Sequence, residues 1–438
     1  MEWWTTLLLI IGGFILLATS GLPVAYCFLT VNIISFCIIA GGLSSLSHLI
    51  LSMKTSISMF AFVPVVMFVL MGEILFHSGV FSRAINSLDN FIGRVPGRLG
   101  LLAVAGGTLF ASMSGSSLGG TAMLGSILIP EMEKRGYKKP ISLGPILGCG
   151  GLAVIIPPSS GAVIIGVLAK ISIGKLLVAG ALPGLLIAAL YTLYIIIRCT
   201  LQPSIAPPYV TSAVTLSKKV RYMIRDVLPF GSIVFFAVGL IFFGVCTPSE
   251  ASALGAFATF VLVAAYKRLT WCAVKQSLVG TLQITVMYLI ILTASTTFSQ
   301  VLAWTGSTRG LVEAALMLNL HPIMLLSAML LTLLILGCFM DSTSIMMMTF
   351  PLLVPVVNAV GFDPVWWGIL TLISLEMGLT TPPFGFLLFI LKGVAPKDTT
   401  MTDLYLAAFP FVLSDMVAII LLIIFPQIVL WLPNLMRG

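Results

Sequence analysis

The sequence of 438 residues has few charged side chains, and this scarcity excludes a soluble protein. Asp, Glu, Lys and Arg together make up 8% of the chain, whereas 59% of the residues are hydrophobic. A soluble globular chain carries about 25% charged residues because its surface faces water. The surface of this chain must therefore face lipid. Only helices and closed barrels satisfy the backbone there, and the long apolar runs predict an all-α polytopic protein in the lipid bilayer.

Histidines and paired cysteines are also scarce, which removes the usual ligands of transition metals. Three histidines occur, at His48, His77 and His321, and none is near another or near a cysteine. The seven cysteines form no CxxC pair and mostly lie in apolar runs, where they act as small hydrophobic residues. We therefore expect no transition metal and no organic cofactor. The net charge of +8 comes from loops between apolar runs, which indicates topology and not nucleic-acid binding.

The first half of the chain contains a helical hairpin pattern and a broken helix. After three apolar runs long enough to cross a bilayer, two runs within 99–130 are too short to cross and flank the polar tip Met113–Ser117. Half-length helices around a polar turn predict a re-entrant hairpin. The next apolar run, 141–170, is interrupted at Pro157 and Pro158. Two prolines remove two backbone donors, so a helix there must unwind.

The second half of the chain repeats this pattern. Adding 225 to the positions of four residues of the first half gives the same residue type in the second half: Pro130 and Pro355, Gly136 and Gly361, Pro157 and Pro382, Pro158 and Pro383. The register predicts a second hairpin over 322–355, with Asp341 at its tip, and a second broken helix over 366–392. We therefore predict two repeats, 1–200 and 226–438, joined by a cytoplasmic linker over 201–225.

The predicted topology makes the two repeats inverted. Each repeat has five predicted spans, because a hairpin enters and leaves the membrane on one side. Five is odd, so the repeats have opposite orientations, as in many secondary transporters. With the linker in the cytoplasm and both termini outside, all but five of the 22 basic residues lie on the cytoplasmic side, in agreement with the positive-inside rule. The exceptions are Lys54, Lys170, Lys175, Arg309 and Arg437.

Polar residues within the predicted membrane region form two clusters, which are functional candidates because such residues are costly in lipid. The first joins the tip Ser114, Gly115, Ser116 and Ser117 to the break Pro157, Pro158, Ser159 and Ser160; the second joins Asp341, Ser342 and Thr343 to Thr380, Thr381, Pro382 and Pro383. Hydroxyls, freed carbonyls and a carboxylate suit a small hard cation such as Na⁺. The helix N-termini beside them suit an anionic substrate.

Other charged residues allow two interpretations each. Glu376 is an ion or proton site, or a satisfied contact between helices, and Glu73 is a weaker candidate of the same kind. Arg309 is either a solvated residue or attracts an anionic substrate or partner on the outer side. Glu250, two residues after Pro248, is interpreted as a helix-start charge favoured by the helix dipole.

Several motifs carry a resemblance to a known family. The chain reads Gly115-Ser116-Ser117, Ile129-Pro130-Glu131-Met132, Arg135-Gly136-Tyr137 and Ile156-Pro157-Pro158-Ser159 in the first half, then Thr247-Pro248-Ser249-Glu250-Ala251, Met340-Asp341, Gly361-Phe362-Asp363-Pro364 and Thr380-Thr381-Pro382-Pro383-Phe384-Gly385. With these motifs it resembles, over essentially its whole length, the large membrane subunit (DctM type) of tripartite ATP-independent periplasmic (TRAP) transporters.

The resemblance implies a Na⁺-coupled importer of organic acids in the bacterial inner membrane, with no enzymatic activity and with both termini in the periplasm. Its implied partners are a small four-helix membrane subunit and a periplasmic substrate-binding protein. The hairpins and broken helices would form a domain that moves like an elevator. The implied sodium-binding residues are Ser116, Ser117, Pro158, Ser159, Asp341, Thr380 and Thr381, and the candidates for substrate binding are Ser114, Gly115, Ser160, Ser342 and Arg309.

The chain departs from the family pattern at two places. Leu118-Gly119-Gly120-Thr121 follows the first tip where alanines are commoner, and Glu376 stands where a small or apolar residue is expected. Two other functions stay open. One is a Na⁺-coupled carboxylate carrier of a related hairpin fold that needs no binding protein. The other is an intramembrane hydrolase using Ser114 or Ser116, which is disfavoured because neither cluster contains a histidine.

Overall fold

The structure is a computed structural model that describes residues 2–39, 46–92, 95–207 and 215–436. These residues form helices and no strand, so the predicted all-α class is confirmed. Arg94 and Arg437, which the predicted topology uses, lie outside the described residues, as do residues 40–42 at the end of the second apolar run of the sequence, 23–42.

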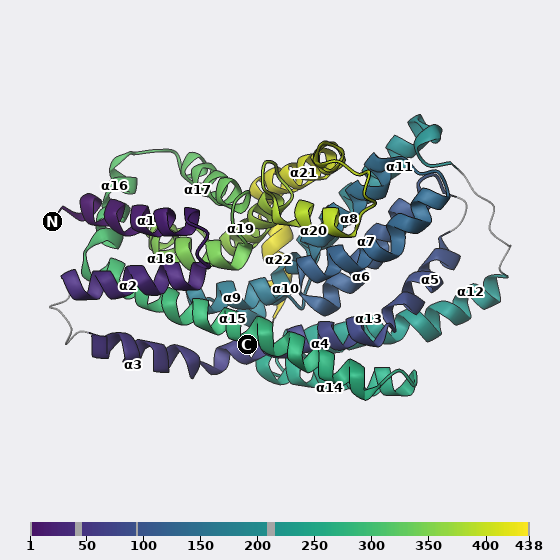
Figure 1. Ribbon diagram of the computed structural model, residues 1–438, viewed down its shortest axis with the longest axis horizontal. Coiled ribbons are helices and arrows are strands. Elements are labelled where there is room, and N and C mark those ends of the chain that lie inside the picture. Colours follow the sequence, from purple (N-terminus) through teal and green to yellow (C-terminus); the bar gives the residue numbers. More distant parts are fainter. Residues whose placement is uncertain (1, 40–45, 93–94, 208–214, 437–438) are drawn as a thin grey trace.

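Helices of the first half follow one another with short connections (Figure 1). Their bounds are α1 Trp3–Thr19, α2 Val24–Ile39, α3 Leu46–Ile57, α4 Val63–Ser78, α5 Phe81–Phe91, α6 Arg98–Ser114, α7 Ser117–Lys134, α8 Lys139–Ile155, α9 Ser160–Ala169, α10 Ile173–Ala179 and α11 Ala181–Leu201. Helices α10 and α11 meet at Gly180 and together, over Ile173–Leu201, are long and apolar enough to form one membrane span.

The second half begins inside the predicted linker, because α12 and a π-helical turn at Met223–Val227 lead directly into α13. The helices are α12 Leu216–Tyr222, α13 Leu228–Phe242, α14 Pro248–Ala265, α15 Trp271–Trp304, α16 Ser307–Met317, α17 Pro322–Gly337, α18 Ser342–Val360, α19 Pro364–Leu379, α20 Phe386–Val394, α21 Met401–Ile424 and α22 Gln427–Leu435. Thr247 and Glu250 form a capping box at the start of α14, which fits the interpretation of Glu250 as a helix-start charge.

The first predicted hairpin is present as α6 and α7, which pack against each other. Gly115 ends α6 with a φ of +56°, a backbone conformation that glycine adopts without steric cost. Ser116 then caps α7, because its hydroxyl oxygen accepts a hydrogen bond from the N–H of Gly119 at 3.3 Å. The polar tip read from the sequence is therefore a helix end followed directly by a helix start.

The second predicted hairpin is present as α17 and α18, which also pack against each other. Asp341 caps α18 by accepting the N–H of Ser344 at 3.0 Å. The sequence predicted an end at residue 355, but α18 continues to Val360 with Pro351 and Pro355 inside it. Both prolines lie inside the helix and do not end it. The helix ends at Gly361, which has the left-handed backbone conformation.

Both predicted breaks are also present. Helices α8 and α9 are separated by residues 156–159 and bent by 43° relative to each other. In the second half, α19 and α20 are separated by residues 380–385. Proline pairs lie in both interruptions, where they remove the N–H groups that would continue the preceding helix.

Two of these helices, α8 and α19, form the centre of the molecule (Figure 1). Residues 141–155 of α8 and 365–379 of α19 are all buried. Helix α8 packs against α6, α7, α19 and α21, so elements of both halves meet on it. The 34-residue helix α15 contacts α2, α3 and α4 as well as α18. The tips and breaks of both halves are therefore held against one shared core.

Among the described residues, fewer helices are long enough to cross a membrane than the ten spans predicted from the sequence. Seven helices of the described residues are long and apolar enough to cross a membrane, and the bent pair α8–α9 gives an eighth. Shorter apolar helices, including α1, α2 and α19, supply the other predicted spans. The long helices also include α18, which the sequence assigned to the second hairpin. The ten-span topology thus stays a prediction.

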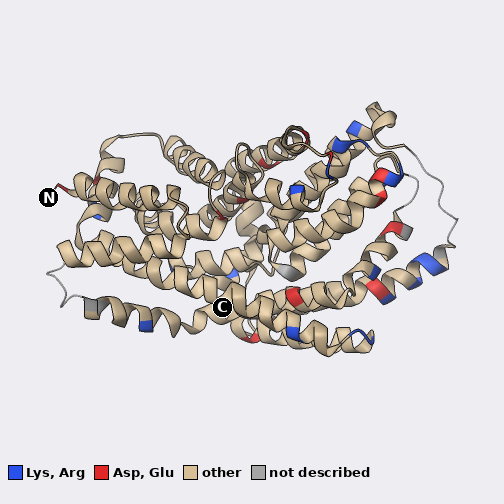
Figure 2. Ribbon diagram, in the orientation of Figure 1, with Lys and Arg blue, Asp and Glu red and all other residues tan. Residues whose placement is uncertain are grey.

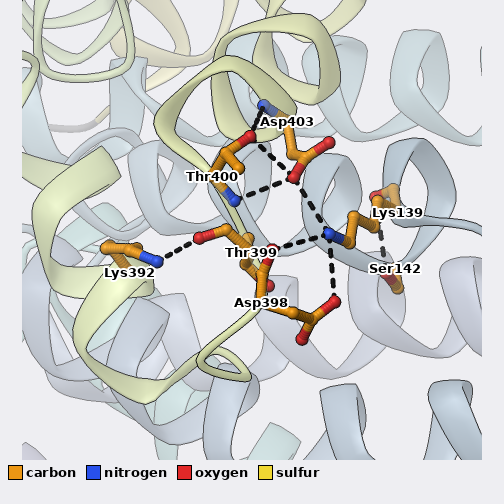
Figure 3. A network of polar contacts seen from close by, with 7 residues as sticks. All are labelled: Lys139, Ser142, Lys392, Asp398, Thr399, Thr400 and Asp403. Atoms are coloured by element: carbon orange, nitrogen blue, oxygen red, sulfur yellow. Dashed lines mark hydrogen bonds and ion pairs between the residues drawn. The ribbon is translucent and has the colours of Figure 1, made fainter.

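Charged residues lie mostly toward one end of the molecule, near α5, α12 and the adjoining ends of α7 and α11 (Figure 2). At this end Lys139 begins α8 and forms ion pairs with Asp403, at 3.0 Å, and Asp398, at 3.2 Å (Figure 3). Lys392 donates to the carbonyl oxygen of Thr399 in the same network. These contacts hold the loop between α20 and α21 against the start of α8. They therefore connect the second broken helix to the first.

Candidate functional site

A pocket of about 290 Å³ lies where the two hairpin tips and the first break come together. Its lining joins polar and apolar residues from both halves: Gly115, Ser116, Ser117, Leu118, Val154, Ser160, Gly161, Ile164, Met287, Tyr288, Asp341, Ser342, Thr343, Met346, Glu376, Leu379 and Phe386. None of these described residues is Lys, Arg or His. The predicted first and second clusters thus contribute to one site.

Three helices begin at this pocket. Ser117, Ser160 and Ser342 are the first residues of α7, α9 and α18, and all three line it. A helix N-terminus carries free N–H groups and a partial positive charge, which favour an anionic group. The pocket can therefore attract an anion although no cationic side chain lines it among the described residues.

The first break is connected to the first tip by a direct hydrogen bond. The hydroxyl of Ser160 donates to the carbonyl oxygen of Gly115 at 2.6 Å, and both groups are buried. A Cβ atom on Gly115 would lie 3.2 Å from the backbone nitrogen of Ser160 and 3.4 Å from the carbonyl oxygen of Pro158. The lack of a side chain at Gly115 is what lets the two backbones approach this closely.

Glu376 connects the two hairpins. Its carboxylate accepts a hydrogen bond from the hydroxyl of Ser117 at 2.8 Å and another from the hydroxyl of Ser342 at 3.1 Å. The residue is 3% exposed and lies on the buried helix α19. From the sequence alone, an ion or proton site and a contact between helices were equally open for Glu376, and the structure places it both in the pocket and between the tips.

Pro158, Ser159, Thr380 and Thr381 lie beside the pocket but not in its lining. Ser159 caps α9 through the N–H of Ala162 at 3.0 Å and is fully buried. The hydroxyls of Thr380 and Thr381 both donate to the carbonyl oxygen of Met377, at 3.0 and 2.6 Å. In this conformation these four residues thus shape the ends of the broken helices.

One substrate candidate, Arg309, lies away from the pocket, and the side chain of another, Ser114, is not described. Arg309 lies on α16 with 86% of its side chain exposed and pairs with Glu313 at 2.9 Å. This is the solvated position that the sequence allowed as one of two interpretations. Ser114 is the last residue of α6, and its side chain lies outside the described part of the structure.

Two features of this region were not predicted from the sequence. Tyr288 and Met287, from the middle of α15, line the pocket, and no helix break or hairpin tip in the sequence marks their position. Asp415, in α21, is a buried carboxylate that accepts a hydrogen bond from the hydroxyl of Tyr191 at 2.5 Å. An acidic residue within an apolar run was the available signal for Asp415, the same signal that identified Asp341.

Comparison with known proteins identifies the family to which this arrangement belongs. Residues 11–428 match the family model described as "Tripartite ATP-independent periplasmic transporter, DctM component". The chain belongs to this family. It is therefore a large permease subunit of a TRAP transporter, and the resemblance drawn from the tip and break motifs is confirmed. Members of the family are transporters and not enzymes.

Named relatives cover nearly the whole chain. The C4-dicarboxylate TRAP transporter large permease protein DctM of Rhodobacter capsulatus is 31% identical, over 98% of this chain and 99% of the relative. The ectoine TRAP transporter large permease protein TeaC of Halomonas elongata is 30% identical, over 95% and 96%. The sialic acid TRAP transporter large permease protein SiaM of Vibrio cholerae is 29% identical, over 98% of each chain.

A solved structure shares the fold. The YdaH transporter of Alcanivorax borkumensis superposes with a TM-score of 0.61 and covers 91% of each chain at 14% sequence identity. That transporter has been described as having an unusual topology. At this identity the likeness concerns the fold alone.

Proposed function

We propose that this permease subunit uses an inward Na⁺ gradient to import a small organic acid that a periplasmic binding protein delivers. The observation that carries the proposal is the pocket formed jointly by Ser116 and Ser117 of the first tip and Asp341 and Ser342 of the second. Elements of both halves are needed to build it, as expected for a substrate site at the interface of two repeats. The proposed setting is the bacterial inner membrane.

Sodium ions are proposed to bind at the tips and breaks. The proposed ligands are the hydroxyl, carboxylate and backbone oxygens of Ser116, Ser117, Pro158, Ser159, Asp341, Thr380 and Thr381. Asp341 supplies the negative charge at the second tip, and its carboxylate is already fixed by the N–H of Ser344. The organic acid is proposed to bind beside the ions, against the N-termini of α7, α9 and α18.

The partners and the transport movement proposed for this subunit are those that the resemblance to the family implies. A small four-helix membrane subunit and a periplasmic binding protein are the proposed partners of this subunit. Two inverted repeats, 1–200 and 226–438, are proposed to place hairpins and broken helices in a domain that moves like an elevator past the other spans. The charged end in Figure 2 is the proposed cytoplasmic end, and both chain termini are proposed to be periplasmic.

Uptake by the reconstituted transporter tests the Na⁺ coupling. The chain is reconstituted in liposomes with its proposed partners, a small TRAP membrane subunit and a periplasmic binding protein, and is offered radiolabelled C4-dicarboxylate, ectoine and sialic acid, the solutes named for relatives. Uptake of the transported solute is expected to require an inward Na⁺ gradient. Equal uptake with K⁺ in place of Na⁺ would contradict the coupling.

The same liposomes distinguish the alternative carrier. Omitting the binding protein is expected to abolish uptake at low solute concentration, because the solute is then not delivered to the pocket. Unchanged uptake without the binding protein would favour a carboxylate carrier that works without a soluble partner.

A further inference from the structure

The pocket contains one more acidic side chain than the proposed sodium ligands include. Asp341 and Glu376 both line it, and no cationic side chain does so among the described lining residues. Glu376 is 3% exposed, and its two recorded hydrogen-bond donors, the hydroxyls of Ser117 and Ser342, are neutral. A buried carboxylate is costly unless a proton or a cation neutralises it. An organic acid entering the pocket would also be repelled by it.

Helix α7, which donates to Glu376 through Ser117, carries a second buried hydroxyl. Thr121 lies one turn beyond Ser117 on α7 and therefore on the same helix face. Its side chain is fully buried, and its hydroxyl oxygen has no hydrogen-bond partner among the described residues. Most buried hydroxyls in proteins have a partner, so an orphaned one calls for an explanation.

Two consecutive glycines of α8 keep this region free of other side chains. A Cβ atom on Gly150 would lie 2.0 Å from the hydroxyl oxygen of Thr121, and one on Gly151 would lie 3.4 Å from the Cβ of Glu376. The backbone of α8 thus passes close to the hydroxyl of Thr121 and to the side chain of Glu376. The remaining open side of Glu376 faces the pocket.

We infer that Glu376 is the anionic ligand of an additional Na⁺ site, formed with the hydroxyl oxygens of Ser117 and Ser342 between the two hairpin tips. The inference rests on the proposed Na⁺-coupled function and adds a ligand to it. The ion would neutralise Glu376 and lie between it and the carboxylate of the organic acid, so solute and ion would each favour the binding of the other. Because both hairpins contribute, binding of the ion would also hold the two tips together.

The competing explanations are that Glu376 holds a proton or that it only connects the hairpins through its hydrogen bonds. Glu376→Gln distinguishes both of them from an ion ligand, because glutamine retains a side-chain oxygen that accepts from Ser117 or Ser342 but has no charge. A purely structural Glu376 would change the melting temperature of the protein without changing its response to Na⁺. A ligand would change the response to Na⁺ itself.

The measurement is the melting temperature of the purified complex, with its small subunit, over a series of NaCl concentrations at constant ionic strength set with KCl. A bound ion raises the melting temperature as its concentration passes the dissociation constant. Glu376→Gln is expected to raise the half-effective NaCl concentration by about tenfold or more, since the variant removes the charge that this site offers the ion. Ser342→Ala, which leaves the Asp341 cap in place, is expected to raise it less.

Glu73→Gln is the matched control. Glu73 lies in the apolar helix α4 and pairs with His77 at 3.2 Å, away from the pocket lining. The same chemical change there is expected to leave the half-effective NaCl concentration as in the wild type. If Glu376→Gln and Ser342→Ala also keep the wild-type response to NaCl, the additional site is wrong. If Glu376→Gln does not fold, Ser342→Ala alone decides.

These outcomes are separate from a failure of the proposed function. If NaCl does not stabilise the wild-type complex more than KCl, the Na⁺-coupled function is contradicted as a whole. If NaCl stabilises the wild type and the Glu376 and Ser342 variants equally, only the additional site is contradicted. A Glu376→Gln variant that alters solute affinity but not the NaCl response would point to a cationic group of the solute as the partner of Glu376, and would also overturn the inference.

Discussion

Asp341→Asn is expected to lower Na⁺-driven uptake by about tenfold or more while leaving the protein folded. Asparagine caps helices about as well as aspartate does, so the hydrogen bond from the N–H of Ser344 is retained. The negative charge is lost, and contacts to a charged group contribute about 1.5–3 kcal/mol, which corresponds to tenfold or more in affinity. Initial uptake rates at a limiting Na⁺ concentration, normalised to the amount of folded protein, measure the effect.

Asp363→Asn is the control for helix capping. Asp363 caps α19 by accepting the N–H groups of Val365 at 2.8 Å and Trp366 at 3.0 Å, but it does not line the pocket. This variant is expected to transport like the wild type. Equal losses in both variants would mean that capping, and not the charge in the pocket, explains the result for Asp341. Full activity of Asp341→Asn would remove Asp341 from the site.

Gly378→Ala is expected to destabilise the protein and to impair transport. A Cβ atom at this position would lie 2.7 Å from the Cα of Gly337 and 2.9 Å from the carbonyl oxygen of Leu334. Both are backbone atoms, so neither can rotate away, and α17 and α19 must move apart. Such overpacking costs about 1–3 kcal/mol of unfolding free energy. Glu376 lies two residues earlier on α19, so its contacts with Ser117 and Ser342 would be disturbed as well.

The melting temperature and the uptake rate both measure this effect, and Gly393→Ala is the control. A Cβ atom on Gly393, in α20, would meet nothing within 4 Å. Alanine is the better helix former by about 1 kcal/mol, so this variant is expected to be as stable as the wild type or more so. A Gly378→Ala variant with wild-type stability and uptake would show that the close crossing of α17 and α19 is not required.

Much of the fold could be predicted from the sequence because its signals are local. The prolines at 157, 158, 382 and 383 lie in both helix interruptions, and the polar tips mark both hairpin turns. The end of α18 could not be predicted in the same way. Pro355 is typical of a helix end, but a helix can contain a proline when its surroundings hold the chain in place. Helix α18 therefore continues to Val360.

The composition of the site was harder to predict because it depends on contacts between distant segments. Of the residues proposed for the site whose side chains the structure describes, six line the pocket: Gly115, Ser116, Ser117, Ser160, Asp341 and Ser342. The approach of Ser117 to Glu376, 259 positions along the chain, has no local signal in either segment. The same holds for Tyr288, which reaches the pocket from the middle of a long apolar helix.

Equilibrium binding of radioactive sodium to the purified complex tests most directly whether cations bind where the two hairpin tips meet. The wild type is expected to bind Na⁺ saturably, and Asp363→Asn is expected to bind the same amount. Asp341→Asn is expected to bind fewer ions, or to bind them about tenfold more weakly, as the loss of a charged contact implies. Unchanged number and affinity of bound ions in Asp341→Asn would contradict the claim.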